Sequence, residues 1–391
     1  MPAAAPTAAR RAVATLFLVN GTLFATWVSR LPAIEAARGF SHAQLGLALF
    51  GIALGAMVAM PLAGALSARI GSDRVSRAAV LLYAGMLPVL VLAPTGVALA
   101  LALFAFGAGH GALDVSMNAQ AVLVEKAYRR PIMSSFHALF STGGLVGAAA
   151  GGFIAAAGLS PALHFALAAA VLGLAAMATF PYLLPASERA QEVARAEVKA
   201  EKRALLSWPS RGLLALGAIA LCLMIGEGAM ADWSAIYLRR VIGTPEGLAA
   251  AGYAAFSIAM AGGRFFGDGL AARFGAVALV RGSAIFALLG LALVLATPFV
   301  PLAMIGFAVV GLGFAAIVPQ VFSAAGHRAG TDPGVALATV TTLGYLGFLF
   351  GPPAIGFAAG LIGLRLALGI LVLTTFLALM LAGSVRTAEK A

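Results

Sequence analysis

Two carboxylates, Asp114 and Glu227, lie deep inside long apolar runs of this sequence. A charged side chain at the centre of a bilayer costs about 2.5–3.5 kcal/mol on insertion scales, so each must face water, a partner or a proton. A carboxylate in such a place can take up a proton and release it again. We therefore interpret Asp114 and Glu227 as proton-coupling candidates. The alternative is that each is a hydrogen-bonded group that holds neighbouring helices together.

Two more polar residues lie close to Asp114 in the predicted helices. Asn118 follows it at helical spacing, and His137 lies in the next apolar run. Asp114 would lie about 18 Å from the helix end at Lys126, and Asn118 follows one turn later on the same face. His137 would lie about 10 Å above Arg130, near the level of Asn118. Asn118 and His137 are thus candidates to line a cavity, although a packing role for His137 stays open.

The other polar and aromatic candidates lie near the ends of apolar runs. Asp232 follows Glu227 by five residues and would lie near the outer surface. Trp27 and Trp233 could stack on a ring or close the outer mouth of a cavity. Tryptophans also anchor spans at the membrane surface, and that alternative stays open.

The composition determines which elements can position these residues. The chain is 62% hydrophobic and 10% charged, with a mean hydropathy of +1.02. A soluble domain carries about 25% charged residues. Apolar runs of about 20 residues recur, and each can cross a bilayer as a helix. Because the runs are continuous rather than alternating, β-strand spans are not expected and an all-α membrane protein is expected.

We predict twelve spans, at 12–34, 44–68, 77–94, 97–124, 131–157, 161–184, 212–238, 247–271, 277–297, 300–325, 333–360 and 363–385. A polar stretch divides them into two sets of six. The predicted organisation is therefore an N-terminal bundle at 1–184, a cytoplasmic linker at 185–211 and a C-terminal bundle at 212–391.

The net charge of +11 raises the possibility of a nucleic-acid partner, but the basic residues cluster in alternate loops. If the N-terminus is inside, Arg264 lies within a span and five basic residues lie outside: Arg30, Arg38, Arg239, Arg240 and Arg365. The other 19 of the 25 lie in inner segments. This bias predicts an oriented membrane protein with both termini in the cytoplasm and no nucleic-acid partner.

The two sets of six spans repeat each other. Trp27 and Trp233 are 206 residues apart, and a group of glycines recurs at a spacing of 204 residues. The glycine pairs are Gly143 with Gly347, Gly147 with Gly351, and Gly152 with Gly356. A parallel repeat of this length in an apolar chain is typical of transporters built from two halves.

Several kinds of chemistry find no support in the sequence. It contains no GxxxxGK[ST] motif, so ATP-driven pumping by this chain is not expected. Five scattered histidines and one cysteine, Cys222, do not form a recognisable metal set, and we expect neither a metal nor a cofactor. No spacing indicates a catalytic triad or a carboxylate pair, so we do not expect an enzyme.

The short loop after the second span resembles the signature of the major facilitator superfamily. It reads Gly64-Ala-Leu-Ser-Ala-Arg69-Ile-Gly71-Ser-Asp-Arg74, and Leu270-Ala-Ala-Arg273-Phe-Gly275 repeats part of it. Ala68 stands where the family usually has an aspartate. The family's loop uses that aspartate as a latch, and this latch is therefore in doubt here.

Three segments resemble poorly characterised bacterial inner-membrane members near the fucose-permease-like group. They are Gly111-Ala-Leu-Asp-Val-Ser-Met-Asn-Ala-Gln120, Pro131-Ile-Met-Ser-Ser-Phe-His137 and Glu227-Gly-Ala-Met-Ala-Asp-Trp-Ser234. The resemblance implies a fold of two pseudo-symmetric six-helix bundles.

The resemblance also implies roles for particular residues. Spans one, four, seven and ten of the family line the central cavity, and here they carry Asn20, Asp114, Glu227 and Gln320. Arg264 and Asp268 are four residues apart at the inner end of span eight and should pair. With the loop residues Arg69, Arg74 and Arg273 they form the predicted cytoplasmic gate.

These observations predict a secondary transporter in the bacterial inner membrane. It would move a small polar solute, a sugar or related metabolite, together with protons, and would work as a monomer by alternating access. Two alternatives stay open. An efflux carrier for hydrophobic compounds would need a less polar cavity, and a solute sensor would normally carry a cytoplasmic output domain.

Overall fold

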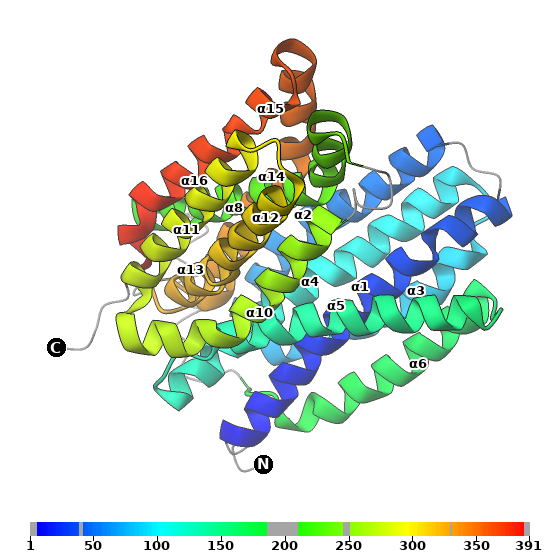
Figure 1. The fold of residues 1–391 in the computed structure, drawn as a ribbon. Coiled ribbons are helices and arrows are strands. Elements are labelled where there is room, and N and C mark those ends of the chain that lie inside the picture. The colour runs from blue at the N-terminus through cyan, green and yellow to red at the C-terminus, as the bar shows by residue number, and fades with distance from the viewer. Residues whose placement is uncertain (1–5, 39–41, 186–209, 245–250, 329–330, 387–391) are drawn as a thin grey trace. The chain divides into compact units, whose positions relative to one another are not determined.

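The computed structural model describes residues 6–38, 42–185, 210–244, 251–328 and 331–386, and all regular elements in these ranges are helical (Figure 1). The predicted linker at 185–211 lies almost wholly outside them. The first helices are α1 (Pro6–Arg38), α2 (His42–Ile70), α3 (Ser72–Leu92), α4 (Gly96–Tyr128), α5 (Met133–Ala156), α6 (Pro161–Thr179) and the short η1 (Phe180–Tyr182).

The second set begins with α8 (Arg211–Tyr237), which runs into a short π-helix, η2 (Leu238–Ile242). It continues with α10 (Ala251–Phe274), α11 (Ala276–Ala296), α12 (Val300–Ala315), α13 (Ile317–Gly326), α14 (Pro333–Ile362), α15 (Leu364–Ala367), α16 (Gly369–Leu381) and η3 (Ala382–Val385).

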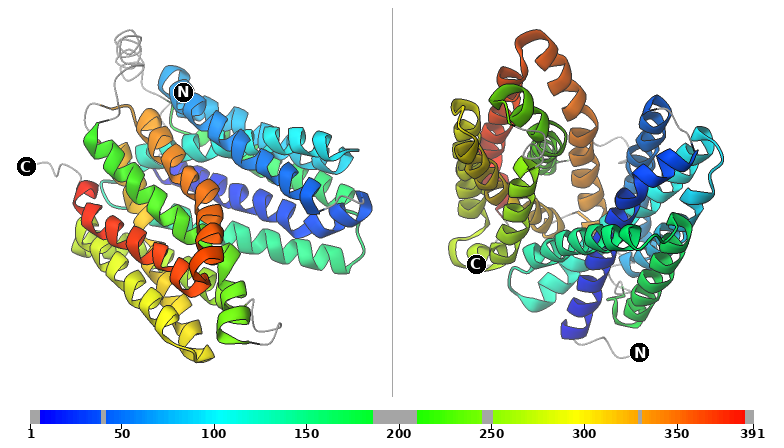
Figure 2. Two further views of the ribbon diagram at one scale, coloured as in Figure 1. Left: turned by 90° about the horizontal axis from the view of Figure 1, so that it is seen from above. Right: turned by 45° about the vertical axis from the view of Figure 1, so that its right-hand side comes forward.

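The chain divides into two units. Unit 1 comprises 1–129, 139–208 and 330–338, and unit 2 comprises 130–138, 209–329 and 339–391. In unit 1, α2 packs along α4, and α3 packs against α4 and α6; in unit 2, α12 packs against α10 and α11 (Figures 1 and 2). Helices α5 and α14 each begin in one unit and continue in the other.

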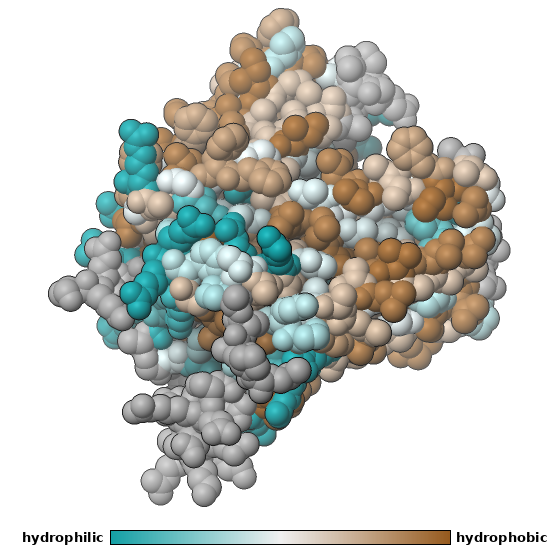
Figure 3. Space-filling view, turned by 90° about the horizontal axis from the view of Figure 1, so that it is seen from below, coloured by the Kyte–Doolittle hydropathy of each residue, from teal (hydrophilic) through white to brown (hydrophobic). Residues whose placement is uncertain are grey.

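The surface of these helices suits a lipid environment. Within the described ranges, eleven helical segments are long and apolar enough to cross a membrane. The remaining predicted span, 247–271, corresponds to α10, which carries Arg264, Asp268 and Arg273. Large apolar side chains are widely exposed, among them Phe153 at 78% and Phe357 at 75%, and apolar residues, coloured brown, occupy much of the right side and top of the view in Figure 3. Exposed apolar area on this scale marks a surface that contacts lipid.

The repeat predicted from the sequence has a counterpart in the helix contacts of each unit. A Cβ atom at Gly107 would clash with the backbone of Ile52, and one at Gly311 would clash with the backbone of Phe256. Phe256 lies 204 positions after Ile52. The same pairing relates Gly109 and Tyr83 to Gly313 and Ala287. Glycine lets two helices approach closely in a membrane, and both halves use it at equivalent positions.

The turns between helices repeat as well. Gly71 precedes α3 with φ 99°, and Gly275 precedes α11 with φ 79°. A residue with a Cβ is strained at such positive φ values, which accounts for glycine in both turns. The two signature-like loops therefore share a glycine of positive φ directly before the next helix.

Span ten, predicted at 300–325, consists of two helices. The helix breaks at Ala316 into α12 and α13, with Pro319 in the first turn of α13. Proline lacks the N–H that would continue the ladder, so the helix restarts from the hydrogen bond of the Gln320 N–H to the Ala316 carbonyl, 3.2 Å long. Span twelve is similarly divided at Leu368.

Replacement of Gly143 by alanine should destabilise the protein by about 1–3 kcal/mol, because the new methyl group would overlap the Leu18 carbonyl of α1. The neighbouring Gly144 has open space around it, so Gly144→Ala is the matched control and should be neutral or slightly stabilising. Thermal unfolding in detergent measures both. Equal unfolding temperatures for the two variants would contradict the packing described for α1 and α5.

Candidate functional site

In unit 1 the candidate residues are arranged along one face of α4. The Asn118 side-chain amide donates to the Asp114 backbone carbonyl at 2.8 Å and to its carboxylate Oδ1 at 3.3 Å. Asp114 is partly exposed, whereas Asn118 is fully buried. Within the described residues the carboxylate thus has one weak intrahelical donor, and it keeps room to accept a proton or a solute hydroxyl.

Asn20 of α1 is linked to the same face of α4. It is fully buried, its Oδ1 lies 2.9 Å from Nδ1 of His110, and its amide donates to the Met117 sulfur at 3.6 Å. His110 precedes Asp114 by four residues, so His110, Asp114 and Asn118 form one polar row. The sequence interpretation overlooked His110, although its spacing of four residues from Asp114 was the signal that could have identified it.

Trp27 lies in the core of unit 1. Its side chain is 1% exposed and contacts the rings of Phe106 and Phe165, with centroid distances of 6.4 and 6.3 Å. In this structure Trp27 contributes to helix packing within the unit. Its proposed contact with a solute ring stays a prediction.

In unit 2 a buried ion pair joins two helices. The Arg264 guanidinium of α10 lies 3.6 Å from the Glu227 carboxylate of α8, and the two side chains are 7% and 14% exposed. Bringing these charges together compensates part of the cost of removing each from water. Glu227 Oε1 accepts no hydrogen bond within the described residues, so this carboxylate keeps acceptor capacity.

The predicted pairing of Arg264 with Asp268 is wrong. The two carboxylate oxygens of Asp268 accept the backbone N–H groups of Ser134 and Ser135, at 2.7 and 2.8 Å. These N–H groups lie in the first turn of α5, where no helical carbonyl is available to them. Both the unpaired N–H donors and the helix dipole favour a carboxylate at this position. The start of α5 therefore binds the Asp268 carboxylate in place of Arg264, which lies on the same helix as Asp268.

Two other candidates lie in unit 2 near the start of α5 and on α13. The His137 ring is buried and meets the edge of the Phe322 ring, with centroids 5.6 Å apart. Gln320 is 4% exposed, and its Nε2 has no hydrogen-bond partner within the described residues. A buried amide donor without a partner is unusual and marks a place where a polar ligand could bind.

The remaining cavity candidates lie at the far end of α8. Trp233 is half-buried against Gly356 of α14, and its indole N–H has no partner within the described residues. Asp232 is exposed. Trp233 therefore differs from its repeat counterpart Trp27, which is packed on all sides.

The predicted gate residues of the two loops are all exposed. Arg69 is in the last turn of α2, Arg74 is in the first turn of α3, and Arg273 lies over the ring of its neighbour Phe274 at 5.2 Å. Within the described parts of the chain, Arg264 and Asp268 are the gate candidates that make partly buried polar contacts. Within the described residues no group of three histidine, cysteine or acidic side chains could hold a metal ion.

Comparison with known proteins identifies the family of the chain. The family model of the Major Facilitator Superfamily matches residues 13–352. An uncharacterized transporter of Sinorhizobium fredii is 39% identical over 373 residues, which covers 95% of this chain and 97% of the relative.

Two solved structures show the same fold at low sequence identity. The E. coli fucose:proton symporter is 18% identical with a TM-score of 0.79, covering 96% of this chain and 98% of the symporter. A proton:xylose symporter is 14% identical with a TM-score of 0.76, covering 96% and 94%. The apolar helices, the repeated halves and these matches together establish that the chain belongs to the Major Facilitator Superfamily and is a multi-pass membrane transporter, not an enzyme.

Proposed function

We propose that this transporter moves a small polar solute together with protons, and that Glu227 and Asp114 are its proton acceptors. The buried pair of Glu227 and Arg264 carries the proposal. Protonation of Glu227 would remove the negative charge that attracts Arg264 and so weaken this ion pair inside an apolar bundle. A solute hydroxyl or carboxylate could then bind Arg264, which links solute binding to proton binding.

The unsatisfied polar atoms support a polar solute. The buried side-chain atoms without a hydrogen-bond partner within the described residues include the acceptor Glu227 Oε1 and the donors Gln320 Nε2 and Trp233 Nε1 of unit 2, and the acceptor Asn118 Oδ1 of unit 1. Buried polar groups without a partner cost about 1–3 kcal/mol each. A hydroxyl group donates and accepts, so a polyhydroxylated solute could satisfy both kinds.

The similar solved structures make sugars the first class to test, because those proteins are a fucose:proton symporter and a proton:xylose symporter. Asn20 and His137 are candidates to move into contact with the solute in another transport state, since both are buried in this one. Asp232 and Trp233 are candidates for its outer end.

We further propose that the bundles at 1–184 and 212–391, joined by the linker at 185–211, alternate access to the two sides of a bacterial inner membrane. The chain would act as a monomer with both termini in the cytoplasm. Arg69, Arg74, Arg264, Asp268 and Arg273 would control the cytoplasmic opening. Green fluorescent protein fused to the C-terminus tests the orientation, because it should fluoresce and an alkaline phosphatase fusion should be inactive.

A ligand screen tests the polar-solute assignment. Purified protein is heated with sugars, nucleosides, amino acids and hydrophobic drugs, because any ligand of the folded state raises its unfolding temperature. We expect one polar class, with L-fucose and D-xylose among the first probes, to stabilise the wild type but not Gln320→Leu. Stabilisation by hydrophobic compounds alone would refute the proposal in favour of an efflux carrier.

A further inference from the structure

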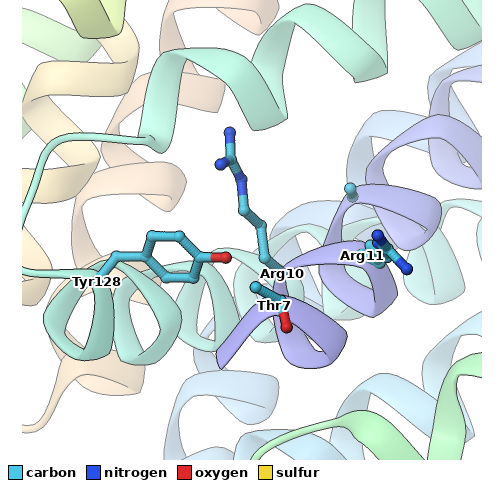
Figure 4. Close-up of a pocket in the computed structure, with 5 residues that line it drawn as sticks. Thr7, Arg10, Arg11 and Tyr128 are labelled. Carbon is cyan, nitrogen blue, oxygen red and sulfur yellow. The ribbon is translucent and has the colours of Figure 1, made fainter. Parts of the chain in front are cut away.

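The N-terminal part of α1 carries two adjacent arginines beside a hollow that the transport proposal does not use. The hollow has a volume of 340 Å³ and is lined by Thr7, Arg10, Arg11, Ala14 and the ring of Tyr128 at the end of α4 (Figure 4). All of these residues belong to unit 1. The site is therefore formed within one unit of the chain.

The charges of this hollow are available to an anion. The Arg10 guanidinium lies over the Tyr128 ring, 5.4 Å from its centroid, which holds the side chain at the hollow without neutralising it. Among the described residues, no carboxylate pairs with Arg10 or Arg11. Two cations at the positive end of a helix dipole favour a phosphate group.

A second hollow on the other side of Arg11 is mostly apolar. It measures 410 Å³, and four residues of α1 and four from α6 and η1 line it: Ala8, Arg11, Ala12, Thr15, Ala175, Ala178, Thr179 and Tyr182. Further along α6 the surface is apolar and exposed, with Val171 and Leu174 each 63% exposed. Arg11 thus lies between a cationic hollow and an apolar surface that faces lipid.

We propose that Arg10 and Arg11 bind the phosphate headgroup of an anionic phospholipid, whose acyl chains lie along α1 and α6. The cationic hollow beside an apolar groove matches a glycerophospholipid, whereas a free anion would use only the first hollow. Basic pockets at the membrane surface bind anionic headgroups in this way. The inference does not depend on the solute or on proton coupling, because binding is measured without transport.

Titration of the purified protein with phosphatidylglycerol, followed by native mass spectrometry, tests the site. Each basic residue near an anionic headgroup contributes about 1 kcal/mol, so Arg11→Gln should weaken binding about five-fold and the double variant with Arg10→Gln about 25-fold. Lysine at both positions should restore most of the affinity. Arg281→Gln, an exposed arginine of α11 in the other unit, is the matched control and should bind as the wild type does.

Two further arms separate lipid from other ligands. Phosphatidylcholine, which carries the same phosphate but no net charge, should bind weakly and equally to all variants. Inorganic phosphate at concentrations matched to the lipid should not displace phosphatidylglycerol. Unchanged phosphatidylglycerol binding by the double variant would overturn the proposal, and displacement by inorganic phosphate would assign the site to a soluble anion. Unfolding temperatures equal to the wild type confirm that the variants are folded.

Discussion

Replacement of Arg264 by methionine is expected to destabilise the protein by about 3–5 kcal/mol and to abolish solute uptake. The substitution leaves the Glu227 carboxylate, 14% exposed, without its cation inside an apolar bundle. The cost arises mainly from that uncompensated charge and not from the lost attraction itself. Unfolding in detergent and uptake into liposomes measure the two effects.

The double variant Glu227→Gln with Arg264→Met separates stability from function. It removes both charges, so most of the stability should return, while uptake should stay absent. Arg281→Met removes an exposed arginine and should change neither property. If Arg264→Met unfolds like the wild type, the ion pair does not exist in the folded protein and the proposed link between proton and solute has no basis.

Replacement of Asp268 by alanine should remove the hydrogen bonds that hold the start of α5 in place. Residues that the start of α5 buries should then become accessible to solvent more often. Loss of a carboxylate cap costs about 1–2 kcal/mol, which corresponds to an opening about tenfold more frequent. A cysteine in place of the fully buried Ala138 reports the opening by its rate of labelling with a maleimide. The background is low because the chain's single cysteine, Cys222, is buried.

Asp73→Ala is the matched control for this experiment. Asp73 pairs with Arg77 on its own helix at 3.4 Å, so its loss should leave labelling at position 138 unchanged. We expect labelling to be about tenfold faster in Asp268→Ala than in the control. Equal labelling rates would mean that Asp268 does not stabilise the start of α5. Asp268 would then no longer be a gate candidate.

The fold was predictable because spacing along the chain encodes helix packing. The glycines at 204-residue intervals allow the same close helix packing in both units, where Gly107 lies against Ile52 and Gly311 lies against Phe256. Apolar runs likewise predict the spans. The break at Ala316 was harder to foresee, since Pro319 alone predicts a kink but not its position.

Partners between helices were less predictable, because they depend on how each helix is rotated about its axis. The spacing of Arg264 and Asp268 suggested a pair, but each residue has a partner from a distant part of the sequence. Likewise, the equivalent positions of Trp27 and Trp233 did not reveal that only Trp27 is fully packed. Repeated positions describe the common framework, whereas the polar contacts differ between the halves.

The most direct test of the central claim is solute accumulation in liposomes under an imposed pH gradient, using the polar solute that stabilises the protein. The wild type should concentrate this solute, while Asp114→Asn and Glu227→Gln should each lose accumulation and at least one should retain exchange without a gradient. Normal accumulation by both variants would contradict the account, because neither carboxylate would then couple the solute to protons.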